Sequence, residues 1–159
     1  MGESWLSYNL LMVEDSLADM RLMLEAVRLA GLKEKASILC AHDGYEALDL
    51  MEGAHKMGGP LKMILLDLNM PKMNGKELLA RIKKDTKFNR IPVFIMTNSD
   101  HKADIEDCFR LGADAFFQKP ADFMRFVDFF IAVRDSLDAQ HKVSAQHVNK
   151  RYSELKVAV

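Results

Sequence analysis

Residues 62–71 read KMILLDLNMP, and this stretch decides the fold. Four apolar residues, Met63 to Leu66, lead directly to a single carboxylate at Asp67, and Pro71 follows four residues later. A short unbroken apolar run is typical of a strand buried on both faces of a parallel sheet. Because a carboxylate inside such a run would be costly to bury, we expect Asp67 at the strand's carboxyl end. Open α/β sheets place their ligand crevice at that end.

The composition limits the class of protein. The chain has 159 residues, of which 49% are hydrophobic and 28% charged, a balance typical of one globular domain. Its formal net charge of -1 favours no nucleic-acid or membrane-surface partner, and no apolar run approaches membrane-spanning length. The two cysteines, Cys40 and Cys108, lie far apart in the sequence with no CxxC spacing, and we expect both to be reduced thiols. We expect a cytoplasmic protein with no nucleic-acid and no membrane partner.

Outward from the 62–71 stretch, short apolar runs alternate with amphipathic helical patterns. The expected strands are residues 9–13, 37–41, 63–66, 92–96 and 113–117, and the expected helices cover 17–30, the segments after Asp43-Gly44 and Asn74-Gly75, the segment from the 98–100 patch to Leu111, and about 121–137. This alternation predicts an α/β fold, a doubly wound five-stranded parallel sheet of order 2-1-3-4-5 with helices on both faces. We expect a domain over residues 8–137 and a C-terminal tail over 138–159, which could form a short helix.

Polar side chains follow four of these strands at the point where each ends. Glu14 and Asp15 follow the first strand, Asp67 the third, Thr97 the fourth, and Lys119 comes after the fifth. Taken singly, each is explained by helix capping, a turn or a solvated side chain. The carboxyl ends of parallel strands share one edge of the sheet, so the coincidence at four strand ends favours a single site.

Three carboxylates at one edge repel one another, and a bound dication resolves that conflict. Hard oxygen ligands favour Mg²⁺, which keeps part of its water shell. We expect Asp15 and Asp67 to bind the metal directly and Glu14 to bind it through water. The backbone carbonyl of Asn69 is a further candidate ligand.

The charge balance of this edge suits phosphoryl chemistry. Three carboxylates, one Mg²⁺ and the ammonium of Lys119 sum to about zero, so that a second anion can approach. Asp67 is then a credible nucleophile for an acyl phosphate. Lys119 and the hydroxyl of Thr97 are expected to bind the phosphoryl oxygens.

These motifs resemble the receiver domain of two-component response regulators. The resemblance is carried by the acidic pair at 14–15, the acceptor in LLDLNMPKMNG, Thr97, Phe116 and Lys119-Pro120. It implies a single-domain response regulator, not an enzyme, that accepts a phosphoryl group on Asp67 from a histidine kinase in a Mg²⁺-dependent reaction. Within the family, VEDSLADMRLMLEAVRLAGL and DLNMPKMNGKELLARIKKD look most like the stand-alone receivers that partner bacterial phytochrome kinases.

The resemblance also implies a switch. Phosphorylation is expected to draw Thr97 inward and to let Phe116 rotate into the vacated space, which remodels the face of the fourth helix, fifth strand and fifth helix. A downstream protein would read this face. Onward transfer to a histidine phosphotransfer protein, in a phosphorelay, is the alternative output.

The segment 122–137 carries more apolar residues than one buried helix face needs. A helix packed on a sheet requires an apolar stripe of about 100°, and here the apolar positions extend well beyond it. A second copy in a two-fold homodimer could cover the second side, and we predict dimerisation through this helix. The alternative cover is the tail, in which Val148, Tyr152, Leu155 and Val159 fall on one side of a short helix.

Three other functions fit the pattern less well. A flavodoxin-type site needs Gly and hydroxyl residues after the first strand, where this chain has Glu14 and Asp15. A phosphatase of the aspartate-nucleophile class needs a general acid two residues after Asp67, and that residue is Asn69. A receiver without phosphorylation, acting as a constitutive interaction module, would lack the chemistry residues that are present here.

Overall fold

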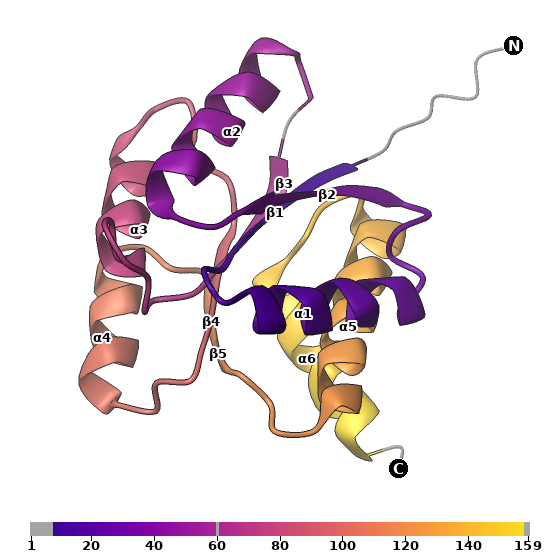
Figure 1. The fold of residues 1–159 in the computed structure, drawn as a ribbon. Coiled ribbons are helices and arrows are strands. Elements are labelled where there is room, and N and C mark those ends of the chain that lie inside the picture. The colour runs from indigo at the N-terminus through magenta and orange to yellow at the C-terminus, as the bar shows by residue number, and fades with distance from the viewer. Residues whose placement is uncertain (1–7, 60, 158–159) are drawn as a thin grey trace, which may run out of the picture.

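Five parallel strands pair in the order β2-β1-β3-β4-β5, which confirms the predicted topology. The computed structural model describes residues 8–59 and 61–157 (Figure 1). The strands are β1 Tyr8–Val13, β2 Ala36–Ala41, β3 Leu61–Leu66, β4 Val93–Thr97 and β5 Ala115–Gln118; the helices are α1 Leu17–Leu29, α2 Gly44–Lys56, α3 Gly75–Lys84, α4 Lys102–Arg110, α5 Phe123–Gln140 and α6 Ala145–Val157.

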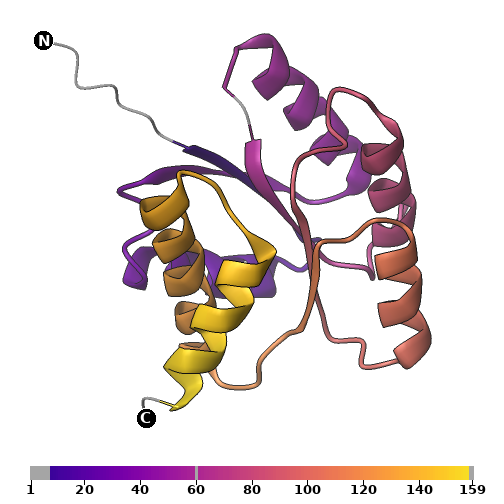
Figure 2. The same cartoon turned by 180° about the vertical axis from the view of Figure 1, so that it is seen from behind.

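The sheet separates two hydrophobic cores. Helices α1, α5 and α6 cover one face, and α2, α3 and α4 cover the other (Figures 1 and 2). The central strand β3 serves both, since alternate side chains of a strand point to opposite faces. Met63 and Leu65 join the core under α1 and α5, whereas Ile64 and Leu66 join the core under α2 and α3. Burial on both faces explains why this strand is a continuous apolar run.

The C-terminal tail forms α6, which packs beside α5 (Figure 2). Val148 is fully buried there. The ring of Tyr152 meets Phe117 of β5 and Phe129 of α5 edge to face, with ring centroids 5.8 and 6.0 Å apart. The guanidinium carbon of Arg125 lies 3.9 Å from the Tyr152 ring centroid. The tail therefore covers the second apolar side of α5.

Polar contacts hold the same two helices together. Nε of Arg151 donates to a carboxylate oxygen of Asp135 at 2.8 Å. The buried hydroxyl of Ser136 donates to the carbonyl of Lys142 and accepts from the N–H of Ser144, both at 2.9 Å. These bonds fix the turn between α5 and α6. Val159, the last apolar position expected on the tail helix, lies outside the described residues.

Two further sequence expectations concern the rest of the chain. Cys40 and Cys108 are both free thiols, and burial raises the pKa of each. None of the helices in residues 8–59 and 61–157 has both the length and the apolar character that a bilayer crossing requires.

Candidate functional site

The ends of β1 and β3 set the positions of two buried carboxylates. The parallel ladder continues one residue past each strand: the N–H of Glu14 donates to the carbonyl of Ala41 at 3.0 Å, and the N–H of Asp67 donates to that of Val13 at 3.1 Å. Both side chains therefore start from fixed backbone at the same edge. Glu14 is 1% exposed and Asp67 is 6% exposed.

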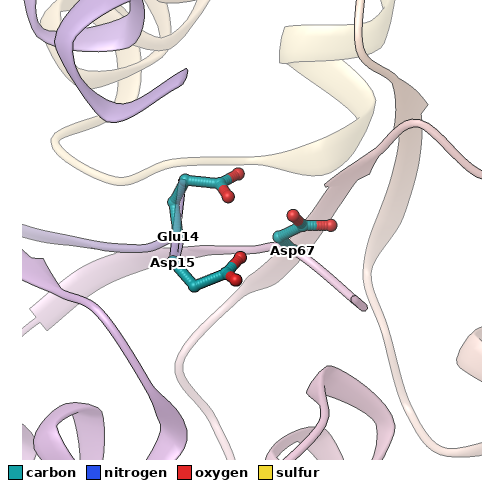
Figure 3. A group of neighbouring side chains, drawn as sticks. All are labelled: Glu14, Asp15 and Asp67. Atoms are coloured by element: carbon teal, nitrogen blue, oxygen red, sulfur yellow. The ribbon is translucent and has the colours of Figure 1, made fainter. Parts of the chain in front are cut away.

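Three carboxylates gather at this edge. Glu14, Asp15 and Asp67 each offer an oxygen, and these oxygens all lie within 4.8 Å of one another. Figure 3 shows the three side chains together beyond the ends of the two strands. Asp15 is exposed, whereas the other two are buried. The predicted acidic group is thus brought together, with one side open to solvent.

Lys119 reaches the same group from the end of β5. Its Nζ lies 2.6 Å from Oε2 of Glu14, 2.7 Å from Oδ2 of Asp19 and 3.2 Å from Oδ2 of Asp67. Its backbone N–H donates to the carbonyl of Thr97 at 2.7 Å, which ties this lysine to the end of β4. Burial alone would lower the pKa of Lys119, but the hydrogen bonds to Asp19 and Glu14 and the charge of Asp67 outweigh it and raise that pKa. The ammonium is therefore charged.

Glu14 is the carboxylate that burial affects most strongly. Desolvation raises the pKa of Glu14 from its ordinary 4.5 to about 7, against the hydrogen bond from Lys119 and one from the N–H of Ser16, and the charge of Asp67 adds to the rise. The single ammonium thus leaves this carboxylate short of positive charge. A further cation would relieve that deficit.

The donor set fits a magnesium ion. Three carboxylates within reach of one another present the hard oxygen ligands that Mg²⁺ prefers. Asp15, Asp67 and Glu14 are the residues that would hold it. The N–H of Asn69 donates to Oδ1 of Asp67 at 3.4 Å, which keeps this residue beside the group. Metal binding by the Asn69 carbonyl stays a prediction.

The two expected switch residues lie on adjacent strands. Thr97 is fully buried at the end of β4, and its Oγ1 accepts from the N–H of Ser99 at 3.4 Å. Phe116 lies on β5 opposite Ile95 of β4 and is half-buried on the face covered by α4. The structure thus places Thr97 beside Lys119 and places Phe116 on the expected signalling face. Their roles as a switch stay predictions.

Two residues of this site were not identified from the sequence. Asp19 lies on the first turn of α1, where an acidic residue is already explained by the helix dipole. The signal that was available is its place in the first turn of the helix that directly follows the acidic pair. Gly75 begins α3, and a Cβ there would lie 2.3 Å from the carbonyl oxygen of Asp67. The absence of a side chain lets α3 start against the Asp67 backbone.

The sheet order, the acidic group and the lysine define a class of protein, and comparison with known proteins identifies that class. The chain belongs to the response regulator receiver domain family, whose model matches residues 10–130. Response regulator Rcp1 of Synechocystis sp. is 35% identical over 112 residues, which are 69% of this chain and 75% of that protein.

Solved structures of related proteins give the same fold. The phosphorylated cyanobacterial phytochrome response regulator RcpA matches with a TM-score of 0.72 and 30% identity, over 85% of this chain and 96% of that one. The Mn²⁺-bound form of Rcp1 matches with a TM-score of 0.68 and 29% identity, over 84% of this chain and 95% of that one. The resemblance to receivers of the phytochrome-associated type is thereby confirmed.

Proposed function

We propose that this receiver accepts a phosphoryl group on Asp67 from the phosphohistidine of a sensor kinase, with Mg²⁺ bound beside it. The observation that supports this most strongly is the contact between Nζ of Lys119 and Oδ2 of Asp67, 3.2 Å, within a group of three carboxylates. It brings a nucleophile, a cation for the incoming anion and a set of metal ligands to one place.

In the proposed transfer, a carboxylate oxygen of Asp67 forms a bond to phosphorus while the N–P bond of the phosphohistidine breaks. The electron pair of that bond stays on the imidazole nitrogen of the kinase, and Asp67 becomes an acyl phosphate. Bound Mg²⁺ would offset negative charge on the carboxylates and on the phosphoryl oxygens. Lys119 and the hydroxyl of Thr97 then donate hydrogen bonds to phosphoryl oxygens.

The proposed output is a change on the face of α4, β5 and α5. Thr97 turns its hydroxyl toward the phosphoryl group, and Phe116 moves into the space that this leaves. Phe109 of α4, 49% exposed, supplies apolar surface on that face for a downstream protein. The similarity to the cyanobacterial phytochrome response regulator RcpA favours a phytochrome as the sensor kinase. We propose the cytoplasm as the location, where the free thiols stay reduced.

Homodimerisation through α5 stays a prediction. Most of the apolar residues of α5 that motivated it lie in one core with Val148 and Tyr152 of α6, and Met124 is exposed. A dimer through α5 would therefore displace α6 or use the outer surfaces of both helices. The mass in solution, measured with and without phosphorylation, decides between a monomer and a dimer.

The phosphoryl-acceptor function is tested with acetyl phosphate. We expect intact-mass spectrometry to show addition of one phosphoryl group in the presence of Mg²⁺ and none with a chelator. D67N should abolish the addition, whereas D49N, the same change on the exposed side of α2, should leave it unchanged. Labelling that persists in D67N, or that needs no metal, would contradict the proposal. Phosphotransfer from the histidine kinases of the same cell then identifies the cognate kinase.

A further inference from the structure

One carboxylate partner of Lys119 is not a proposed metal ligand. Oδ2 of Asp19 lies 2.7 Å from Nζ of Lys119, closer than Oδ2 of Asp67 at 3.2 Å. The position of Asp19 is fixed by the start of α1, where its backbone N–H donates to Oγ of the N-cap Ser16 at 3.2 Å. Asp19 thus faces the lysine from a rigid helix end.

The ammonium has no free donor left. A lysine has three N–H groups, and Glu14, Asp19 and Asp67 provide one acceptor for each. If Lys119 is to bind a phosphoryl oxygen on Asp67, it must release at least one of these partners.

Solvent access decides which partner is released at the lowest cost. The side chains of Glu14 and Asp67 are 1% and 8% exposed, so water cannot readily replace the lysine at either carboxylate. The side chain of Asp19 is 32% exposed, so water can replace the lysine at this carboxylate. Asp19 is therefore the partner that Lys119 can leave most readily.

We propose that Asp19 is a positioning residue that competes with Asp67 for Lys119 and thereby sets how strongly the site binds a phosphoryl group. This rests on the proposed function of Asp67. In the unphosphorylated protein, Asp19 draws the ammonium toward α1 and leaves more of the charge of Asp67 for a dication. When a phosphoryl group arrives, the ammonium must give up Asp19, and this exchange weakens phosphoryl binding.

The proposal predicts effects of opposite sign for two ligands. In D19N the ammonium shifts toward Asp67 and Glu14, so calorimetric titration with Mg²⁺ alone should give a severalfold weaker affinity. Titration with beryllium fluoride at saturating Mg²⁺, as a mimic of the phosphoryl group on Asp67, should give a severalfold tighter affinity. E25Q removes one carboxylate from the exposed side of the same helix and should change neither affinity.

A second variant separates action through the lysine from the direct field of the Asp19 charge. K119M still carries the three proposed ligands, so its Mg²⁺ affinity can be measured with and without D19N. If Asp19 acts through Lys119, the effect of D19N on Mg²⁺ affinity should fall to less than twofold in this background. An undiminished effect would overturn the proposal.

The remaining outcomes separate this inference from the function on which it rests. If the wild-type protein binds beryllium fluoride and D19N behaves like E25Q, Asp19 has no positioning role and the proposed function stands. If D19N weakens the binding of both Mg²⁺ and beryllium fluoride, the role of Asp19 is structural and the inference is wrong. If the wild-type protein binds neither Mg²⁺ nor beryllium fluoride, the proposed function itself fails, and the inference fails with it.

Discussion

The ammonium group of Lys119 lies 3.2 Å from Oδ2 of Asp67, although the two residues are 52 positions apart in the sequence. The same ammonium contacts Glu14 and Asp19, so one cation joins the carboxyl ends of β1, β3 and β5 and the first turn of α1. A buried network of this kind contributes to stability and chemistry together, and the two contributions can be separated by experiment.

Substitution of Lys119 by Met should destabilise the metal-free protein and make it more dependent on Mg²⁺. Loss of one partner from a buried charged group costs about 3 kcal/mol of unfolding free energy, because the carboxylates of Glu14 and Asp67 lose their buried cationic partner. Mg²⁺ supplies positive charge at the same place, so the deficit of K119M in urea denaturation should shrink by about 1 kcal/mol or more when saturating Mg²⁺ replaces a chelator. An equal deficit in both conditions would show that the metal and the lysine do not share these carboxylates.

The pH dependence of stability should carry the signature of Glu14. Its pKa in the folded protein, about 7, lies above its ordinary value of 4.5. The folded state therefore binds more protons than the unfolded state. The contribution of Glu14 to folding stability is fully present below pH 4.5 and is lost as the pH rises through about 7. In chelator, Glu14 should make the unfolding free energy of the wild-type protein fall by about 1 kcal/mol between roughly pH 6 and pH 8. E14Q should not show this fall. Parallel curves for the two proteins would contradict the raised pKa.

Gly75 and Gly53 provide a matched pair of substitutions. A Cβ at Gly75 would lie 2.3 Å from the carbonyl oxygen of Asp67, and this backbone cannot move without moving the acceptor. G75A should therefore cost about 1–3 kcal/mol of unfolding free energy and weaken Mg²⁺ binding. Gly53 lies within α2, and a Cβ there would have no neighbouring atom within 4 Å, so G53A should stabilise the protein by about 0.5–1 kcal/mol. Calorimetry of metal binding and urea denaturation measure both effects.

Removal of α6 should make the protein associate with itself. A chain that ends at His141 exposes apolar surface of α5 and β5 that Val148 and Tyr152 now contact. We expect light scattering to show a higher mass for the shortened chain than for the full chain at equal concentration. V148D should have the same effect, because it places a charge in a fully buried position, whereas K150A on the exposed side should not. A shortened chain with the mass and stability of the full one would show that α6 is dispensable as a cover.

Much of the fold was predictable because buried parallel strands leave a clear pattern. The strand order and all five strands were predicted correctly, with ends that differ by at most two residues, as at β5, which was predicted at 113–117 and observed at Ala115–Gln118. There, Asp114 is a connecting residue whose carboxylate accepts from the N–H of Val93 at 2.8 Å. Apolar character alone does not distinguish Ala113 before this residue from a strand residue.

The site was predictable as far as strand ends define it. Glu14, Asp67 and Lys119 meet because each directly follows a strand. Asp19 was missed because its partner depends on how α1 is aimed over the sheet edge, and a one-dimensional pattern does not contain that angle. The end of α5 was predicted too early, at about residue 137. The helix continues to Gln140 and stops at His141, which adopts a left-handed conformation with φ of 54°.

The tail shows a different limit. An apolar stripe on residues 122–137 establishes that a second surface is covered, but a copy of the chain and the chain's own tail satisfy the stripe equally well. The choice depends on the turn held by Ser136, whose two hydrogen bonds reverse the chain direction. The structure puts α6 on α5, whereas the predicted homodimer stays untested.

Because α6 packs on α5, the helices α5 and α4 tolerate mutation to different extents. Eight residues of α5 are buried, so mutations along much of this helix would disturb the core. In α4, by contrast, Cys108 alone is buried, and most of its positions can drift without loss of stability. A lineage that gains a new signalling partner would therefore accumulate its changes in α4, while α5 and α6 diverge slowly and together.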